Sequence, residues 1–177
     1  MFLLIRLPET RRLKKVEDII VQVCRAGIGL AFAVLITAVL IQVLTRTFGS
    51  SPVWTEELTR YALLYIAAFG AGLSLRSGEL VNVDILSESL PGRGSRLLRL
   101  FCAFLTAGLC AVLIGPAWQY VSIGALQTSP AMSLRMDFVH FSVMLLLVIL
   151  FLFSVLRIVA MIVFGEDGRP VQREDVS

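Results

Sequence analysis

One short segment of the chain, Trp54-Thr-Glu-Glu57-Leu-Thr-Arg60, brings two acids close to a base. On a helix, Glu56 stands four residues and Glu57 three residues before Arg60, and both spacings allow an ion pair to form. A carboxylate within a membrane can also carry a proton across it. The same residues therefore suit either a structural ion pair or proton transfer, and the choice depends on where the chain places them.

The composition places this segment in a membrane protein. Of the 177 residues, 57% are hydrophobic and 16% are charged, which excludes a disordered chain and most soluble domains. A membrane-spanning helix needs about 20 apolar residues. We therefore predict an all-α integral membrane protein, a single membrane domain over residues 1–177. Its four transmembrane helices are expected at 26–44, 56–75, 98–118 and 138–156.

The segments between these spans differ in charge and pattern. We expect a basic amphipathic segment at 1–25, loops at 76–97 and 119–137, and a tail at 157–177. Apolar residues at helical spacing between positions 13 and 23 predict a helix that lies among the lipid headgroups before the first span. In the long uncharged run after Arg99, Pro116 and Pro130 offer places for the helix to break, so we expect residues 119–135 to form either an uncharged loop or a helix at the membrane surface.

The lysines and arginines predict the orientation of the chain. Of the 16 basic residues, 13 lie in the N-terminal segment, the 76–99 region and the C-terminal tail. Basic residues are enriched on the cytoplasmic side of membrane proteins. We therefore expect the N- and C-termini and the loop 76–97 to be cytoplasmic, and the loop 119–137 to be periplasmic.

The second span is expected to carry charges into the membrane. Only 15 uncharged residues separate Arg60 from Arg76, which corresponds to about 22 Å of helix. To cross the core, the helix must extend back toward Glu56, so that Glu56, Glu57 and Arg60 lie within its outer turns. Trp54 suits an anchor at the interface. An ion pair within the helix end and an ion pair to another helix or subunit both remain open.

Two further features of this span predict close helix packing and a possible ion pair, the Arg76–Asp84 clasp, just beyond its end. Gly70 and Gly72 lie in a stretch of small residues that allows a neighbouring backbone to approach, in this chain or in another. Arg76 and Asp84 could pair if the helix breaks between them at Gly78, or could be solvated independently. Each of these residues is a candidate for subunit contact or local structure.

Other kinds of chemistry have little support in the sequence. The three cysteines have no ligand-type spacing, His140 is the only histidine, and there is no phosphate-binding loop or paired nucleophile and base. We therefore predict no enzyme activity, no cofactor and no metal site. The net charge of +3 is too small to indicate nucleic acid binding. Arg93, Arg96 and Arg99 are expected to contact lipid phosphates, which makes membrane lipids a predicted partner.

Eight short elements of the chain together resemble a known family. They are Arg46, Trp54-Thr-Glu-Glu57, Arg60-Tyr61, Gly70-Ala-Gly72, Arg76-Ser-Gly78, Val81-Asn-Val83-Asp84 and Leu86, with Thr128-Ser-Pro130-Ala131 further on. This pattern, the length and the four spans resemble the small membrane subunit of tripartite ATP-independent periplasmic (TRAP) transporters, the DctQ-like family. The resemblance covers most of the chain and is strongest between residues 46 and 86.

The resemblance implies a function and two protein partners. In that family a periplasmic solute-binding protein delivers a small organic acid, typically a carboxylate, to a complex of a small and a large permease subunit in the bacterial inner membrane. Transport is driven by a sodium or proton gradient. The resemblance implies that this chain is a static scaffold for the large subunit and helps to dock the binding protein.

Two other functions remain open on the residues alone. One is an autonomous small proton-coupled transporter in which Glu56 or Glu57 carries the proton, although both acids lie near one end of their helix. The other is an accessory subunit of a different membrane complex.

Overall fold

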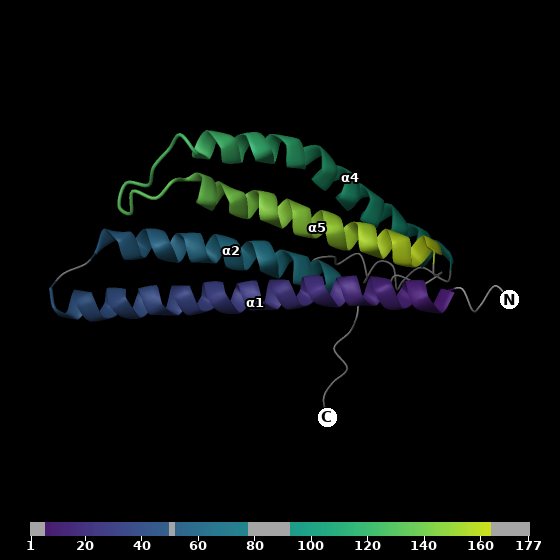
Figure 1. The fold of residues 1–177 in the computed structure, drawn as a ribbon, viewed down its shortest axis with the longest axis horizontal. Coiled ribbons are helices and arrows are strands. Elements are labelled where there is room, and N and C mark those ends of the chain that lie inside the picture. The colour runs from purple at the N-terminus through teal and green to yellow at the C-terminus, as the bar shows by residue number, and fades with distance from the viewer. Residues whose placement is uncertain (1–5, 50–51, 78–92, 164–177) are drawn as a thin grey trace, which may run out of the picture.

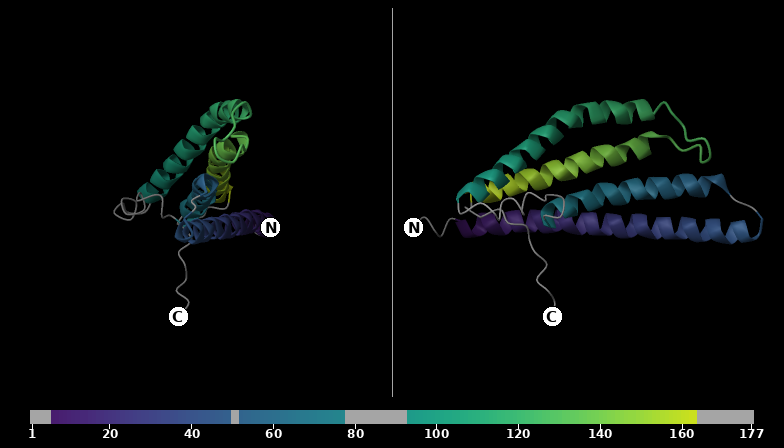
Figure 2. Two further views of the ribbon diagram at one scale, coloured as in Figure 1. Left: turned by 90° about the vertical axis from the view of Figure 1, so that its left-hand side faces the viewer. Right: turned by 180° about the vertical axis from the view of Figure 1, so that it is seen from behind.

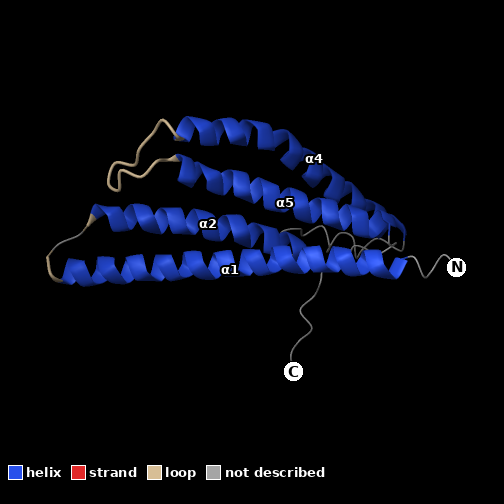
Figure 3. Ribbon diagram, in the orientation of Figure 1, coloured by secondary structure: helices blue, strands red, loops and turns tan. Residues whose placement is uncertain are grey.

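Four long helices make up the protein. A computed structural model describes residues 6–49, 52–77 and 93–163, and the side chains of residues 14–49, 52–77 and 94–163 within them. The helices are α1 (Arg6–Thr47), α2 (Val53–Ser77), α4 (Arg93–Gly124) and α5 (Asp137–Val163) (Figure 1). Figure 3 draws no strand in the described part of the chain, where the only β-type pairing is an isolated bridge between Thr128 and Arg135. The all-α fold is therefore confirmed.

The helices follow one another in a row instead of enclosing a common core. α1 packs on α2, α2 packs on α5 and α5 packs on α4, whereas described residues of α4 contact neither α1 nor α2 (Figures 1 and 2). One cluster of buried side chains joins α1, α2 and α5, and another joins α4 and α5. The clusters are Val21, Cys24, Leu75, Ile149 and Phe153, and Cys110, Ala117 and Leu147.

α1 and α4 run in one direction and α2 and α5 in the other, so the neighbours α2 and α5 are parallel and the bundle has two distinct ends (Figure 1). At the basic end, α1 and α4 begin and α2 and α5 finish; Arg76, Arg96, Arg99 and Arg157 lie there. At the loop end, the chain turns from α1 into α2 and from α4 into α5. This arrangement suits four crossings with both termini on one side, while the side that the basic end faces stays a prediction.

All four helices are long and apolar enough to cross a membrane, which confirms the predicted number of spans. Large apolar side chains are exposed along each of them, including Leu30, Leu63, Val112 and Phe141. A water-soluble monomer rarely exposes so much apolar surface. Because α2 is the least apolar of the four, it is the helix most in need of polar contacts inside the membrane.

The first helix differs from its prediction. Residues 13–23 do not form a separate headgroup helix: they belong to α1, which continues without interruption to Thr47 and has a length of about 63 Å. Val21 and Cys24 are buried against α2 and α5. Of the apolar stripe that suggested a lipid surface, Ile20 packs against this cluster, whereas Val16, Ile19 and Val23 remain exposed.

The third helix also differs. The expected break at Pro116 is wrong, since α4 continues through this proline to Gly124. Membrane helices tolerate proline where other groups satisfy the backbone that it frees. The helix bends along its length in Figure 1, as proline-containing helices commonly do. The loop to α5 therefore covers residues 125–136 and is shorter than expected.

Candidate functional site

Glu57, in the second turn of α2, holds the loop 125–136. Its carboxylate accepts a hydrogen bond from the Ser129 hydroxyl and bonds of 3.2 Å from the backbone N–H groups of Ala131 and Met132. Ser129 is almost fully buried, and its hydroxyl oxygen also accepts a 3.2 Å bond from the Met132 N–H. Hydrogen bonds to a charged acceptor are stronger than neutral ones. One carboxylate thus fixes a turn that lies 72 to 75 residues away in sequence.

The loop is ordered by its own backbone as well. The Ser129 N–H donates to the Leu134 carbonyl at 2.8 Å, and the Met136 N–H donates to the Gln127 carbonyl at 3.0 Å. Ser133 adopts the left-handed conformation, with φ of 53°, which few residues other than glycine adopt without cost. The loop is therefore a folded turn that presents a fixed surface beyond the helices.

Two tyrosines of α2 tie the same helix to the start of α5. The Tyr61 hydroxyl approaches the Met136 sulfur at 3.8 Å, and the Tyr65 hydroxyl donates to the Phe138 carbonyl at 2.6 Å. Tyr61 and Tyr65 are one helical turn apart, so with Glu57 they form a continuous line of contacts along one side of α2. We call Glu57, Tyr61, Tyr65 and the loop residues 129–132 the loop clamp.

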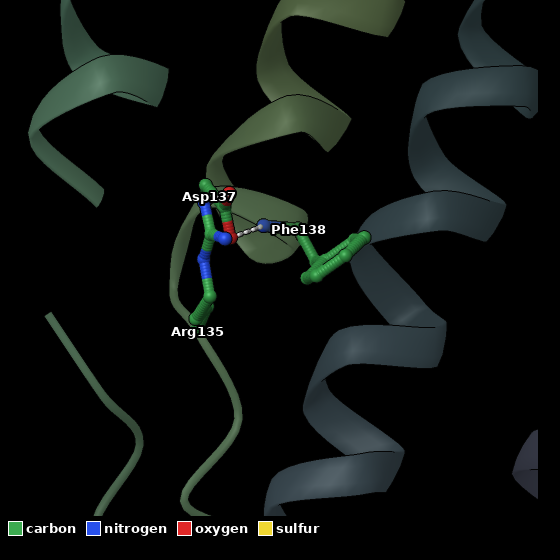
Figure 4. A network of polar contacts seen from close by, with 3 residues as sticks. All are labelled: Arg135, Asp137 and Phe138. Atoms are coloured by element: carbon green, nitrogen blue, oxygen red, sulfur yellow. Dashed lines mark hydrogen bonds and ion pairs between the residues drawn. The ribbon is translucent and has the colours of Figure 1, made fainter. Parts of the chain in front are cut away.

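The start of α5 has its own ion pair at the edge of the loop clamp. Arg135 Nη2 donates to Asp137 Oδ2 at 2.6 Å, and Asp137 Oδ1 accepts a 3.0 Å bond from the Phe138 N–H (Figure 4). An acid at a helix N-terminus satisfies a free N–H group and interacts favourably with the helix dipole. The side chain of Arg135 is 60% exposed, so this pair serves mainly to begin α5.

A stacked aromatic pair closes the other side of the loop. The rings of Tyr120 and His140 lie 3.8 Å apart and nearly parallel, and His140 Nδ1 is 3.1 Å from the Tyr120 carbonyl oxygen. A side chain on Gly124 would collide with the His140 ring, so this position at the end of α4 requires a glycine. His140 therefore acts as a packing residue that joins the end of α4 to α5.

The predicted ion pair within α2 is not formed. Glu57 turns toward the loop, and neither Glu56 nor Glu57 is among the ion-paired side chains in the part of the chain that the structure describes. Glu56 and Arg60 are both exposed. Trp54 is 37% exposed beside them. Sequence spacing could not reveal the true partner, because Ser129 is close only after α5 has packed on α2.

The two glycines of α2 have different surroundings: Gly72 packs against α5, whereas Gly70 has no neighbouring atoms on its open side. A side chain on Gly72 would overlap Ile149 Cγ2 of α5, and Ala68, one turn earlier, is fully buried. Nothing lies within 4 Å of the position where a Gly70 side chain would begin. Gly72 is thus required for the α2–α5 contact, while Gly70 lies on a face that this chain leaves uncovered.

Arg76 has a partner other than the predicted one. Its Nε donates to Glu17 Oε1 at 2.5 Å, which joins the last turn of α2 to α1. Asp84, the proposed partner, lies outside the described residues, so that clasp is not tested. The pairing with Glu17 was missed because it depends on α1 continuing as one helix across the basic end.

We expect this ion pair to contribute modestly to stability. The two side chains are 25% and 29% exposed, and pairs of this kind contribute up to about 1 kcal/mol. Glu17→Gln and Arg76→Gln should each destabilise the protein slightly, and the double variant should be no worse than either. A double-mutant cycle on unfolding in detergent measures the coupling, with exposed Asp18→Asn as the control; no coupling would show that the pair contributes nothing.

The described residues contain no group of three His, Cys, Asp or Glu side chains placed to hold a metal ion. The chemistry of the described polar contacts is structural: they connect helices, fix a loop and begin helices.

Comparisons with known proteins agree on one family. The family model described as "Tripartite ATP-independent periplasmic transporters, DctQ component" matches residues 35–163. A protein of Haemophilus influenzae named "Putative TRAP transporter small permease protein" is 24% identical over 126 residues, which covers 71% of this chain and 78% of that protein. The matched region contains α2, α4, α5 and the whole loop clamp.

Proposed function

The chain belongs to the DctQ family of components of tripartite ATP-independent periplasmic transporters, and we propose that it is the static scaffold on which the large permease subunit assembles. It is a subunit of a TRAP transporter and a multi-pass protein of the bacterial inner membrane. The proposal extends this assignment to a role for particular residues of α2.

Arg60 is the observation that carries the scaffold proposal. If α2 is centred on a core about 30 Å thick, Arg60 lies about 7 Å inside its edge. The side chain is exposed on the bundle surface, and no acceptor for it is found among the residues that the structure describes. A charge at this depth needs a polar partner or must extend to the interface. An acidic or polar group on the large subunit would supply that partner.

The uncovered face of α2 gives the large subunit room to approach Arg60. Leu63, Leu64 and Ala67 are exposed one and two turns further along the helix, and Gly70 faces open space. Small residues allow close contact between helices in membranes. The scaffold surface that we propose is therefore formed by Arg60, Leu64, Ala67 and Gly70.

Replacing Arg60 with leucine tests this assignment. We expect Arg60→Leu to lower the amount of large subunit that co-purifies with this chain by roughly tenfold, which corresponds to a loss of about 1.4 kcal/mol. Arg25→Leu removes an exposed arginine from α1 and should leave co-purification unchanged. Equal recovery with Arg60→Leu and the wild-type chain would contradict an assembly role for this residue.

The loop clamp supports a second part of the proposal, a docking surface for the periplasmic solute-binding protein. With the predicted orientation, the loop end faces the periplasm. A fixed loop binds a partner with less loss of conformational entropy than a mobile one. The contacts of Glu57 with residues 129–132 therefore suit a surface that a soluble protein meets repeatedly.

The position of the acids favours a scaffold over an autonomous transporter. Acidic residues of the described helices fall in the first third of α1, the first two turns of α2 and the first turn of α5. Glu57 is already bound to the loop, and Glu56 is exposed near the same end. We propose that the substrate and ion sites lie in the large subunit, and that the complex imports small carboxylates with a sodium or proton gradient.

A further inference from the structure

The first turns of α4 gather polar side chains at the basic end of the bundle. Arg96 Nη2 donates to the Met161 carbonyl at 2.6 Å. This carbonyl is one of the last in α5 and has no partner within its own helix. Arg96 therefore caps the C-terminus of α5, and its positive charge lies at the negative end of the helix dipole.

Arg99, one turn deeper, is in a different situation. It is 7% exposed, and its Nε is enclosed with no hydrogen-bond acceptor in the described part of the chain. Arg76, Arg96 and Arg135 each have an acceptor. Native structures rarely leave a buried charged group without a partner, and an absent ion or ligand is one common explanation.

The two helices that enclose Arg99 offer it no nearby carboxylate. α4 contains no acidic residue, and the only acid of α5 is Asp137, at the opposite end of that helix. Arg99 lies on the stripe of α4 that faces α5, with Ala103 one turn deeper and the buried Ser95 one turn closer to the end. A charged acceptor for Arg99 therefore has to come from outside α4 and α5.

The depth of Arg99 indicates what that acceptor is. About 14 Å of helix separates it from the midpoint of α4, so it lies at the edge of a hydrocarbon core about 30 Å thick. Phospholipid phosphates begin at this level. Leu97 and Phe101, on the outer side of the same turns, are 66% and 63% exposed and would lie along acyl chains.

We propose that Arg99, Ser95 and the first turn of α4 bind the phosphate of an anionic phospholipid at the basic end of the α4–α5 interface. The guanidinium group supplies the charge, and the free N–H groups of the helix N-terminus add hydrogen bonds to the phosphate oxygens. Basic sites between membrane helices bind anionic headgroups in this way. The lipid would complete the α4–α5 contact at the end where Arg96 already joins the two helices.

Thermal unfolding of the full-length chain in a non-ionic detergent tests the site. Dioleoylphosphatidylglycerol should raise the unfolding midpoint of the wild-type chain, because a ligand that binds only the folded state stabilises it. Dioleoylphosphatidylethanolamine and inorganic phosphate should cause no rise. Arg99→Met should lose the phosphatidylglycerol response, whereas Arg25→Met, which removes an exposed arginine of α1, should keep it.

Arg99→Met is chosen because this variant should still fold, so that a lost response to lipid reports on binding. Because it removes a buried charge without a described counter-charge, it should fold at least as well as the wild-type chain in the absence of lipid. A phosphatidylglycerol response that survives in Arg99→Met would overturn the site. An equal response of the wild-type chain to inorganic phosphate would overturn the assignment to a lipid.

Discussion

Glu57→Ala is expected to free the loop 125–136 and to lower uptake by the assembled transporter by roughly tenfold or more. The variant removes the acceptor for three donors at once: the Ser129 hydroxyl and the N–H groups of Ala131 and Met132. The hydroxyl of Ser129 is buried and the other two donors are half-buried, so losing their charged acceptor destabilises this loop conformation. The loop should then sample other conformations, and the proposed docking surface should lose its fixed shape.

Hydrogen exchange measured by mass spectrometry reports this change directly. In Glu57→Ala, the amides of Ala131 and Met132 should exchange roughly tenfold faster, because local opening no longer has to break their bonds to the carboxylate. Glu56→Ala is the matched control, since Glu56 is the exposed neighbour with the same charge. If exchange at these two amides were unchanged in Glu57→Ala, the loop would not depend on this carboxylate.

Gly72→Ala is expected to separate α2 from α5 and to destabilise the protein by about 1–3 kcal/mol, the usual cost of overpacking. The added methyl group would overlap Ile149 Cγ2 and approach the Phe153 ring to 3.3 Å. Ile149 and Phe153 both belong to the cluster that joins α1, α2 and α5, so they have little room to move. The unfolding midpoint should fall by roughly 3–10 °C for a chain of this size.

Gly70→Ala provides the comparison for this prediction. Gly70 is two residues away on the same helix, and the position of its missing side chain is open. Alanine favours helix over glycine by about 1 kcal/mol, so this variant should be as stable as the wild-type chain or slightly more so. Thermal unfolding in detergent distinguishes the two, and equal midpoints for Gly72→Ala and Gly70→Ala would show that the α2–α5 contact tolerates a side chain.

The number of helices could be predicted because it depends on local composition. In a membrane protein, a long uncharged stretch bounded by charged residues predicts a transmembrane helix. The helix ends were less predictable. The third span was predicted to end at residue 118, with Pro116 as a possible break, yet the helix continues to Gly124, where a side chain would collide with His140. This steric restriction at Gly124 arises from the packing of α5, and the helix preferences of single residues do not predict it.

The partners of the charged residues could not be predicted from spacing. Glu57 and Arg60 stand at an ideal distance for an ion pair, but Glu57 instead binds donors more than 70 residues away. Several well-placed donors on a folded loop compete successfully with one flexible arginine at a helix surface. The same holds for Arg76, which pairs with Glu17 across two helices. In both cases the partner in the structure lies on another element, which spacing along the chain does not bring close.

Uptake by reconstituted components tests the scaffold proposal most directly. Proteoliposomes would contain this chain, the large permease subunit or both, with the binding protein outside and a sodium or proton gradient across the membrane. A panel of radiolabelled monocarboxylates and dicarboxylates serves as substrate. The scaffold account predicts uptake only when all three proteins are present. Uptake by this chain alone, or full uptake without it, would contradict the account.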